Sequence, residues 1–264
     1  MKKTTTRILL SEPVFDEKPL FHWGWLAESV KEAANPGTTV DYVNLKRGYR
    51  RLTSAYVRAY NTIGVVRRAY EAETQGYDAF VIGCASDLAL KEARSLVTIP
   101  VVGLTESTLL FANLLGNRFS VIATDPSYQE RIQNLIKSYG VGEKLASIRC
   151  PAGLNSPKNF SMMEGGKAEQ QKLIDMLLAE MTEAVKRDRA EALYVACIPT
   201  SAMLMKYKVT KVEGAPVVDM FVSGLKIAEN MVTLKRVYGS AVCKNGLYKA
   251  SPPGWDKEIP IDAD

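Results

Sequence analysis

The sequence predicts an α/β fold of two similar domains, each with a four-stranded parallel sheet flanked by helices, related by a pseudo-twofold axis. Two observations lead to this prediction. Short apolar segments alternate with helix-length amphipathic segments along most of the 264 residues, which is the pattern of βαβ units. In addition, a strand-like segment that ends in a cysteine occurs twice, at residues 77–84 and 190–197. The repeat indicates that the two halves share one architecture.

Several segments are predicted to be strands because they are short, apolar and followed by small or polar residues. Apolar runs of this length are typical of strands that are buried on both faces of a parallel sheet. The predicted strands are residues 7–10, 38–43, 79–83, 101–103, 119–123, 193–196 and 217–219.

The segments between these strands carry apolar residues at helical spacing and are long enough for helices. Asp125-Pro126 before residue 127 and Gly140 after residue 139 are typical residues for the ends of one of them. The predicted helices are residues 21–34, 56–75, 106–115, 127–139, 166–187 and 221–235.

The internal repeat continues beyond each cysteine. Residues 99–103 (Ile-Pro-Val-Val-Gly) follow Cys84, and residues 215–219 (Ala-Pro-Val-Val-Asp) follow Cys197 at a similar distance. Each of these segments leads into an amphipathic helix. A diverged duplication accounts for this agreement better than chance does.

The predicted domains are residues 1–104 together with a returning C-terminal segment, 221–264, and residues 105–220. Ligands of open α/β sheets bind beyond the carboxyl ends of the strands, and each predicted domain has one cysteine at such an end. The pseudo-twofold axis would then make Cys84 and Cys197 face each other across an active site between the domains.

Composition excludes several classes of protein. Apolar residues make up 47% of the chain and charged residues 24%, which is ordinary for a globular protein. The net charge of +5 comes from short groups such as Lys46-Arg47 and Arg50-Arg51, which we interpret as solvated faces, so no nucleic-acid partner is expected. No apolar run is long enough to span a membrane, and residues 1–7 lead directly into a strand, so we expect a cytoplasmic protein without a membrane partner.

The cysteines indicate neither disulfides nor a metal site. Cys84, Cys150, Cys197 and Cys243 are far apart and form no CxxC or Cys/His group, so in a reducing compartment they are expected to be free thiols. The single histidine, His22, leaves hydrolase triads poorly supported, and we interpret it as structural, with a role at a site entrance as the alternative. No GxGxxG motif or P-loop is present, and no cofactor is predicted.

Two thiols at matched positions suit a racemisation. Inversion at a carbon next to a carbonyl requires a base on one face and an acid on the other, and a thiol with an ordinary pKa near ~8.5 can serve as either. Cys84 and Cys197 are the predicted acid and base. The alternative, that each is a small buried residue at a strand end, would be preferred for either cysteine alone, and it is our interpretation of Cys150 and Cys243.

Residues that follow the strands are the predicted substrate contacts, because hydroxyl groups and helix N-terminal amides stabilise an enolate or a carboxylate. For any one Ser, Thr or Asp, a role as a helix cap is an equally good interpretation. The predicted contacts are Ser11, Glu12, Ala85, Ser86, Asp87, Thr124, Ile198, Pro199 and Thr200.

Four segments resemble the aspartate/glutamate/hydantoin racemase superfamily, and its hydantoin racemase branch most of all. They are residues 81–84 (Val-Ile-Gly-Cys), 99–103, 118–124 (Arg-Phe-Ser-Val-Ile-Ala-Thr) and 215–219. The ending of the chain, Asn-Gly-Leu-Tyr at residues 245–248 followed by Pro252-Pro253, is similar to that of the same branch. The resemblance begins near residue 77 and extends through most of the remaining chain.

The resemblance implies two α/β domains with a catalytic cysteine from each, no cofactor, a small-molecule substrate such as a 5-substituted hydantoin, and possible homo-oligomers. The chain departs from the branch at Ser11-Glu12-Pro13, at Ala196 and at residues 198–200. Three alternatives therefore stay open: a maleate-type cis-trans isomerase, an arylmalonate-type decarboxylase, and a non-catalytic protein that binds small acids.

Overall fold

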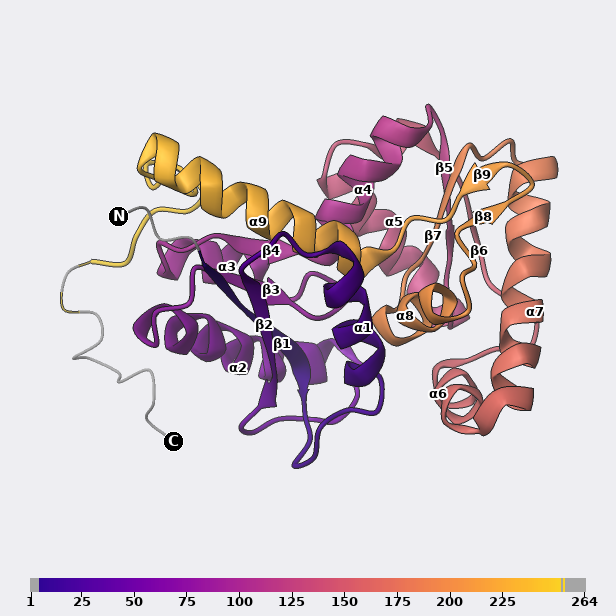
Figure 1. Ribbon diagram of the computed structural model, residues 1–264, viewed down its shortest axis with the longest axis horizontal. Helices are drawn as coiled ribbons and strands as arrows, with labels where there is room; N and C mark the ends of the chain where they lie inside the picture. Colours follow the sequence, from indigo (N-terminus) through magenta and orange to yellow (C-terminus); the bar gives the residue numbers. More distant parts are fainter. Residues whose placement is uncertain (1–4, 253, 255–264) are drawn as a thin grey trace. The chain divides into compact units, whose positions relative to one another are not determined.

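The computed structural model describes residues 5–252 and residue 254 (Figure 1). Packing of the main chain separates these residues into two compact units. The first consists of the described residues within Met1–Leu20, Val30–Gly103 and Leu225–Asp264, and the second of Phe21–Ser29 and Leu104–Gly224. The domain bounds expected from the sequence stay a prediction, and each unit is described below by itself.

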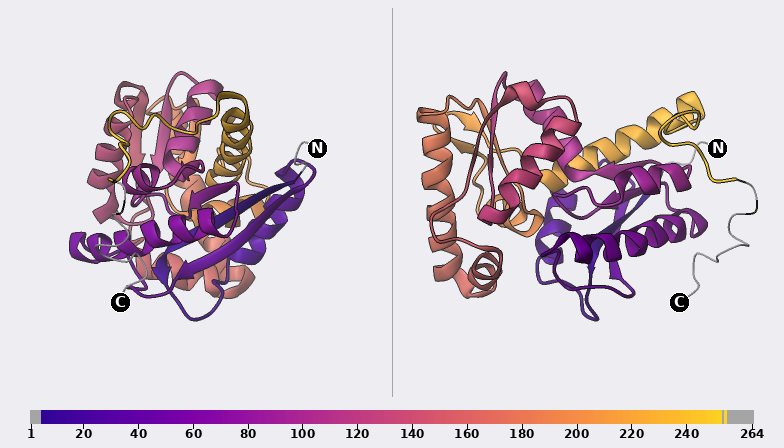
Figure 2. Two further views of the ribbon diagram at one scale, coloured as in Figure 1. Left: turned by 90° about the vertical axis from the view of Figure 1, so that its left-hand side faces the viewer. Right: turned by 180° about the vertical axis from the view of Figure 1, so that it is seen from behind.

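The first unit contains the expected four-stranded parallel sheet. Its strands are β1 (Thr6–Phe15), β2 (Thr38–Leu45), β3 (Ala79–Ile82) and β4 (Val101–Gly103), in the order β2-β1-β3-β4. The helices that connect these strands are α1 (Trp23–Ala33), of which Trp23–Ser29 belongs to the second unit, α2 (Ala55–Thr74) and α3 (Leu90–Leu96). Within this unit α2 covers one face of the sheet, and the C-terminal part of α9 (Met220–Tyr238) lies over the other (Figures 1 and 2).

Strand β1 is longer than predicted. Ser11 and Glu12, which were expected in a loop after the strand, lie within β1 and are buried. The pairing with β2 shifts register between Ser11 and Phe15, and Asn61 of α2 donates to the Pro13 carbonyl at 2.8 Å. The irregular strand thus continues past a proline because side chains replace part of the regular hydrogen-bond ladder.

The second unit contains a parallel sheet of three strands, β6 (Leu145–Arg149), β5 (Phe119–Ile122) and β7 (Ala192–Val195), in that order. The connecting helices of this unit are α4 (Leu104–Leu115), α5 (Gln129–Ser138), α6 (Ser156–Glu164), α7 (Gly166–Lys186) and α8 (Ile198–Lys206), with short 3₁₀ turns at Pro126–Tyr128 and Gly142–Lys144. The α/β class predicted from the sequence is therefore confirmed.

The fourth strand expected in this unit, residues 217–219, does not form. Val217 makes only an isolated parallel bridge with Leu193, and the residues before it form a small antiparallel hairpin, β8 (Lys211–Val212) and β9 (Ala215–Pro216). Pro216 has no N–H group to donate to a neighbouring strand. Asp219 accepts a hydrogen bond from the Val222 N–H at the start of α9, which ends the extended segment.

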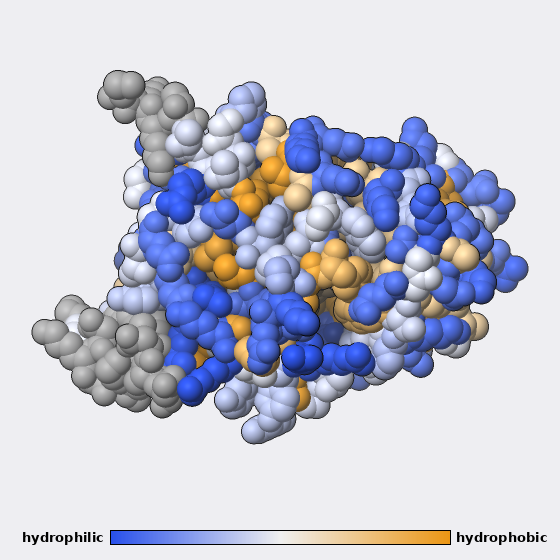
Figure 3. All heavy atoms as spheres, turned by 60° about the horizontal axis from the view of Figure 1, so that its bottom comes forward, coloured by the Kyte–Doolittle hydropathy of each residue, from blue (hydrophilic) through white to orange (hydrophobic). Residues whose placement is uncertain are grey.

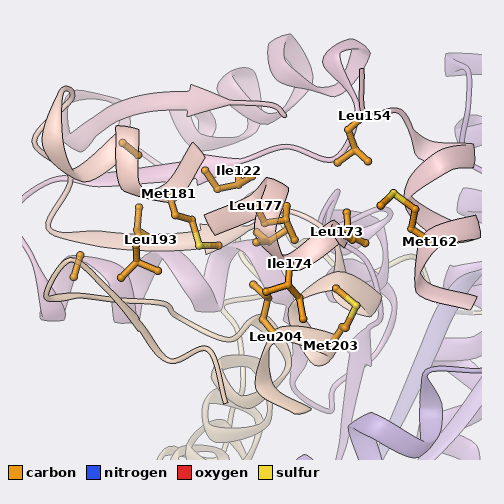
Figure 4. Packing of buried hydrophobic residues seen from close by; sticks show 14 of the residues in the cluster. Ile122, Leu154, Met162, Leu173, Ile174, Leu177, Met181, Leu193, Met203 and Leu204 are labelled. Atoms are coloured by element: carbon orange, nitrogen blue, oxygen red, sulfur yellow. The ribbon is translucent and has the colours of Figure 1, made fainter. Parts of the chain in front are cut away.

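The core of the second unit is formed between α7 and the sheet. Leu173, Ile174 and Leu177 of α7 pack with Ile122 of β5 and Met203 of α8, and all five side chains are buried (Figure 4). Each buried side chain of this size contributes about 1.5–3 kcal/mol. The rigid core fixes the carboxyl ends of β5 and β7 relative to the start of α8.

The two cysteine-bearing strands are hydrogen-bonded in the same way. The Gly83 N–H donates to the Ser11 carbonyl at 2.8 Å, and the Ala196 N–H donates to the Ile122 carbonyl at 2.9 Å. In each unit the cysteine N–H then donates to the carbonyl two residues earlier, at 2.8 Å. The repeat in the sequence is thus a repeat of backbone geometry, and each cysteine is the second residue after its strand.

Residues near the C-terminus bind along α3. The Lys244 ammonium donates to the carbonyls of Arg94, Ser95 and Val97, and the Arg94 guanidinium lies over the ring of Tyr248. Burial lowers the pKa of Lys244. Pro253 of the predicted ending lies outside the described residues.

Hydrophilic side chains predominate on the face shown in Figure 3, with smaller apolar areas between them. Among the helices of the described residues, none combines the length and the apolar character that a membrane crossing requires.

An ion pair fixes the end of β6. The Arg149 guanidinium donates to both carboxylate oxygens of Asp188, at 2.5 and 3.0 Å, and lowers the pKa of that carboxyl group. We expect Arg149→Leu to lower the free energy of unfolding by about 1–3 kcal/mol at pH 7. Because the pKa of Asp188 is lower in the folded state, its ionised carboxylate stabilises the fold fully when the pH is above the unfolded-state pKa, about 4. This stabilisation is lost as the pH falls through the folded-state pKa. Urea unfolding of both proteins at pH 7 and pH 3 should therefore give a smaller difference at pH 3, and an unchanged difference would contradict the ion-pair explanation.

Candidate functional site

Cys84 lies in a tight turn at the carboxyl end of β3. Its side chain is partly exposed, and its Sγ lies 3.2 Å from the Ser86 Oγ and 3.5 Å from the Ser86 backbone N–H nitrogen, which donates to it. The hydroxyl group can donate to a thiolate or accept from a thiol. Ser86 can therefore hydrogen-bond to Cys84 as a thiol and as a thiolate. A residue that acts both as an acid and as a base must adopt both of these states.

Two carboxyl groups lie beside the strand ends that flank Cys84. A Cβ placed on Gly83 would lie 3.2 Å from the Glu12 Cδ, and a Cβ placed on Gly103 would lie 2.6 Å from the Asp87 Cγ. Because β1, β3 and β4 are neighbours in the sheet, Glu12 and Asp87 occupy either side of the strand that leads to Cys84. Both are buried, and Asp87 has a positive φ of 46°. Ala85 is the partly exposed residue between Cys84 and Ser86.

Cys197 is the N-cap residue of α8, and its side chain makes no capping hydrogen bond to the first turn. Its backbone is extended, its carbonyl accepts the Ser201 N–H at 2.8 Å, and its side chain is partly exposed. Ile198 and Pro199, which were expected in a loop, form the first turn of this helix, where proline needs no hydrogen-bond acceptor. The free N–H groups and the dipole of a helix N-terminus favour a negative charge, so the position suits a thiolate.

Asn159 is a polar neighbour of Cys197 that the sequence did not indicate. Its Nδ2 donates to the Cys197 Sγ at 3.8 Å and to the Thr200 Oγ1 at 3.0 Å, and both Asn159 and Thr200 are fully buried. The Thr200 hydroxyl also lies 3.5 Å from the Met163 sulfur. Asn155 caps α6 through its side chain and Pro157 follows, a pattern that could have revealed this helix, but nothing local indicates that Asn159 contacts Cys197.

A buried hydrogen-bonded pair connects α8 to α9. The Ser201 hydroxyl donates to the Asp219 Oδ2 at 2.6 Å and accepts the Met220 N–H at 3.1 Å. Burial raises the pKa of Asp219, and the hydrogen bonds from Ser201 and the backbone N–H groups of Phe221 and Val222 oppose that shift. The Ser201 hydroxyl is thus engaged in fixing the start of α8.

Thr124 is buried two residues beyond β5. Ile122 pairs with Val195 in the adjacent strand β7, so Thr124 and Cys197 extend beyond the same edge of the sheet. The structure thus divides the predicted site residues into two groups at sheet ends. Ser11, Glu12, Cys84, Ala85, Ser86 and Asp87 lie in the first unit, and Thr124, Cys197, Ile198, Pro199 and Thr200 lie in the second.

Cys150 directly follows β6 and extends beyond the same sheet edge as Thr124. Burial, with the carboxylates of Asp125 and Glu180 nearby, raises the pKa of Cys150 to about 11. Cys243 is exposed, and His22 is buried. In the described part of the chain, no three His, Cys, Asp or Glu side chains are grouped so that they could hold a metal ion.

A family model and two related proteins place the chain in the same family. The family model described as Asp/Glu/Hydantoin racemase matches residues 25–228. The chain is 32% identical to a hydantoin racemase of Pseudomonas sp. (strain NS671) over 224 residues, which cover 85% of this chain and 84% of that protein. It is 27% identical to a hydantoin racemase of Paenarthrobacter aurescens, with 79% and 86% of the two chains covered.

The fold is that of a solved racemase. The structure of an allantoin racemase from Klebsiella pneumoniae superposes with a TM-score of 0.80 at 24% identity, and the match covers 94% of each chain. The matched family model includes both cysteine-bearing strand ends. The chain therefore belongs to the Asp/Glu/hydantoin racemase family, and it is a racemase, a class of isomerase.

Proposed function

We propose that the protein is a cofactor-independent racemase of 5-substituted hydantoins or related amino-acid derivatives, with Cys84 and Cys197 as its two acid and base groups. One cysteine, as a thiolate, removes the proton from the carbon next to the carbonyl and leaves an enolate. The other, as a thiol, donates a proton to the opposite face of that carbon. The product is the other enantiomer, and the two sulfurs have exchanged their protonation states.

The observation that carries this proposal is the matched geometry of the two cysteines. Each is the second residue after a parallel strand, each N–H donates to the carbonyl two residues earlier, and each side chain is partly exposed. Each sulfur also has a hydrogen-bonding neighbour, Ser86 or Asn159. Equivalent groups suit a reaction whose substrate and product are mirror images.

The carboxyl groups of Glu12 and Asp87, at the strand ends on either side of β3, support a hydantoin-type substrate. When ionised, Glu12 and Asp87 repel a substrate carboxylate, whereas they can accept hydrogen bonds from ring N–H groups. Apart from Ala85, the remaining predicted contacts are hydroxyl groups and the N-terminal turn of α8, which can stabilise the negative charge that develops on a carbonyl oxygen. These features favour a cyclic ureide over aspartate, glutamate or maleate, and the named activities of the relatives agree with this choice.

The test is proton exchange in deuterated buffer without added cofactor. Single enantiomers of 5-substituted hydantoins and of allantoin, together with aspartate, glutamate and maleate, would be followed by NMR for loss of the carbon-bound proton and by polarimetry for racemisation. We expect exchange with racemisation of at least one hydantoin or of allantoin, and none with the dicarboxylates. Racemisation of aspartate or glutamate alone, or formation of fumarate from maleate, would contradict the proposed substrate class.

A further inference from the structure

The amide of Asn159 has a fixed hydrogen-bonding direction toward Cys197. An amide nitrogen only donates, so at this contact the sulfur must be the acceptor. The other contact of Nδ2 is the Thr200 Oγ1, which leaves the threonine hydroxyl proton for the Asn159 Oδ1 at 3.3 Å or the Met163 sulfur at 3.5 Å. A donor to sulfur stabilises a thiolate more than a thiol.

The backbone that carries Asn159 is held from several sides. The Asn159 N–H donates to the Asn155 carbonyl at 2.8 Å within the capped first turn of α6, and the Gln170 side chain of α7 donates to the Met163 carbonyl at 2.6 Å. Met162 and Met163 of α6 are part of the core of this unit. The donor is therefore positioned before any substrate binds.

We propose that Asn159 is a positioning residue that holds the Cys197 sulfur as a hydrogen-bond acceptor at the start of α8, so that Cys197 is the first of the two site cysteines to ionise as the pH rises. The inference rests on the proposed two-thiol function, which it deepens by assigning the resting base. Free enzyme would carry a thiolate at Cys197 and a thiol at Cys84.

The charged groups near each cysteine agree with this assignment. The carboxyl groups of Glu12 and Asp87 lie at the strand ends on either side of β3 and, when ionised, oppose a further negative charge there. The Cys84 sulfur accepts the Ser86 N–H at 3.5 Å and contacts the Ser86 hydroxyl group, which can serve a thiol as well as a thiolate. Asp219 contacts the first turn of α8 through Ser201, and burial raises the pKa of its carboxyl group. Cys197 also has the N-terminus of a nine-residue helix, whereas no helix begins at Cys84.

The experiment measures thiol ionisation and needs no substrate. Wild type and Asn159→Leu would be alkylated with iodoacetamide from pH 5 to pH 10, and the rate at each cysteine would be read by mass spectrometry of its peptide. We expect wild-type Cys197 to react at a lower pH than Cys84. In Asn159→Leu we expect the Cys197 rate at pH 7 to fall about tenfold, as loss of a hydrogen bond to a charged group predicts, with the Cys84 rate unchanged.

Two further variants separate positioning from folding. Asn159→Asp keeps the shape of the side chain. When ionised, the carboxylate has no donor and adds a negative charge near the sulfur, so both effects should shift the Cys197 profile to higher pH even if the leucine variant unfolds. Asn155→Ala removes the N-terminal cap of the same helix. We expect it to lose about as much thermal stability as Asn159→Leu and to keep an unchanged alkylation profile at Cys197. Cys84 ionising first in wild type, or an unshifted Cys197 profile in a folded Asn159→Asp protein, would overturn the proposal.

A kinetic measurement distinguishes failure of the Asn159 proposal from failure of the proposed two-thiol function. Because enantiomers have equal free energies, kcat/KM must fall equally in the two directions in every Asn159 variant. The proposal expects the acidic limb of the kcat/KM profile to move to higher pH together with Cys197 alkylation. If Cys197→Ser retained full racemisation, the two-thiol function itself would be wrong, whatever the alkylation profiles showed.

Discussion

Replacing either Cys84 or Cys197 with serine is expected to lower kcat/KM for racemisation by about 10³-fold or more. A serine hydroxyl is a far weaker acid than a thiol, so it can neither form the base near neutral pH nor donate a proton readily, and general acid–base catalysis is typically worth about 10²–10⁴-fold. The measurement is racemisation of one enantiomer by polarimetry, with folding checked by circular dichroism.

Each single variant should retain a diagnostic partial reaction. With Cys197 intact and Cys84 replaced, one enantiomer can still lose its proton to Cys197 and regain deuterium from the same side, whereas the other enantiomer cannot. We therefore expect exchange without inversion, and of opposite enantiomers in the two variants. Cys150→Ser is the matched control, because burial keeps that thiol protonated near neutral pH, and its activity should equal that of wild type. Full activity in either single variant would eliminate the two-thiol mechanism.

Much of the fold was predictable because it depends on local patterns. Short apolar runs between amphipathic helices indicated the four strands of the first sheet and β5 and β7 of the second, but not β6. The repeated strand-cysteine pattern proved to be a repeat of hydrogen bonding at the ends of β3 and β7. The prediction was wrong at residues 217–219, where Pro216 and the capping role of Asp219 outweigh the apolar Val217-Val218 pair. The helices α3, α6 and α8 were not predicted because seven to nine residues give too little periodicity.

The site was predictable only in part, for a physical reason. The local sequence shows which residues directly follow a strand, and this criterion identified Cys84, Cys197 and their neighbours in the chain. Contact between residues far apart in the chain depends on packing, and no local pattern reveals it. Asn159 contacts Cys197 from a separate helix, and the Glu12 carboxyl lies beside Gly83 because two strands are paired.

The absence of a side chain at Gly103 is expected to be essential for the position of Asp87. A methyl group there would lie 2.6 Å from the Asp87 Cγ and 2.9 Å from the Leu90 Cδ2. Asp87 is buried and already has a positive φ, so its backbone cannot adjust without further strain. We expect Gly103→Ala to lower the free energy of unfolding by about 1–3 kcal/mol, and to lower kcat/KM because the Asp87 carboxyl is displaced from the Cys84 turn.

A double-mutant cycle separates this crowding from a general effect of replacing glycine. Asp87→Gly removes the carboxyl group and suits the positive φ, so Gly103→Ala should cost less in that background, with a coupling energy of about 1 kcal/mol or more in urea unfolding. Gly24→Ala is the matched control, because Gly24 lies in α1 with no atom within 4 Å of the added Cβ, and it should be neutral or slightly stabilising. Additive effects of Gly103→Ala and Asp87→Gly would show that the two residues do not compete for one space, and the carboxyl group would then have to be held beside Cys84 by contacts other than the end of β4.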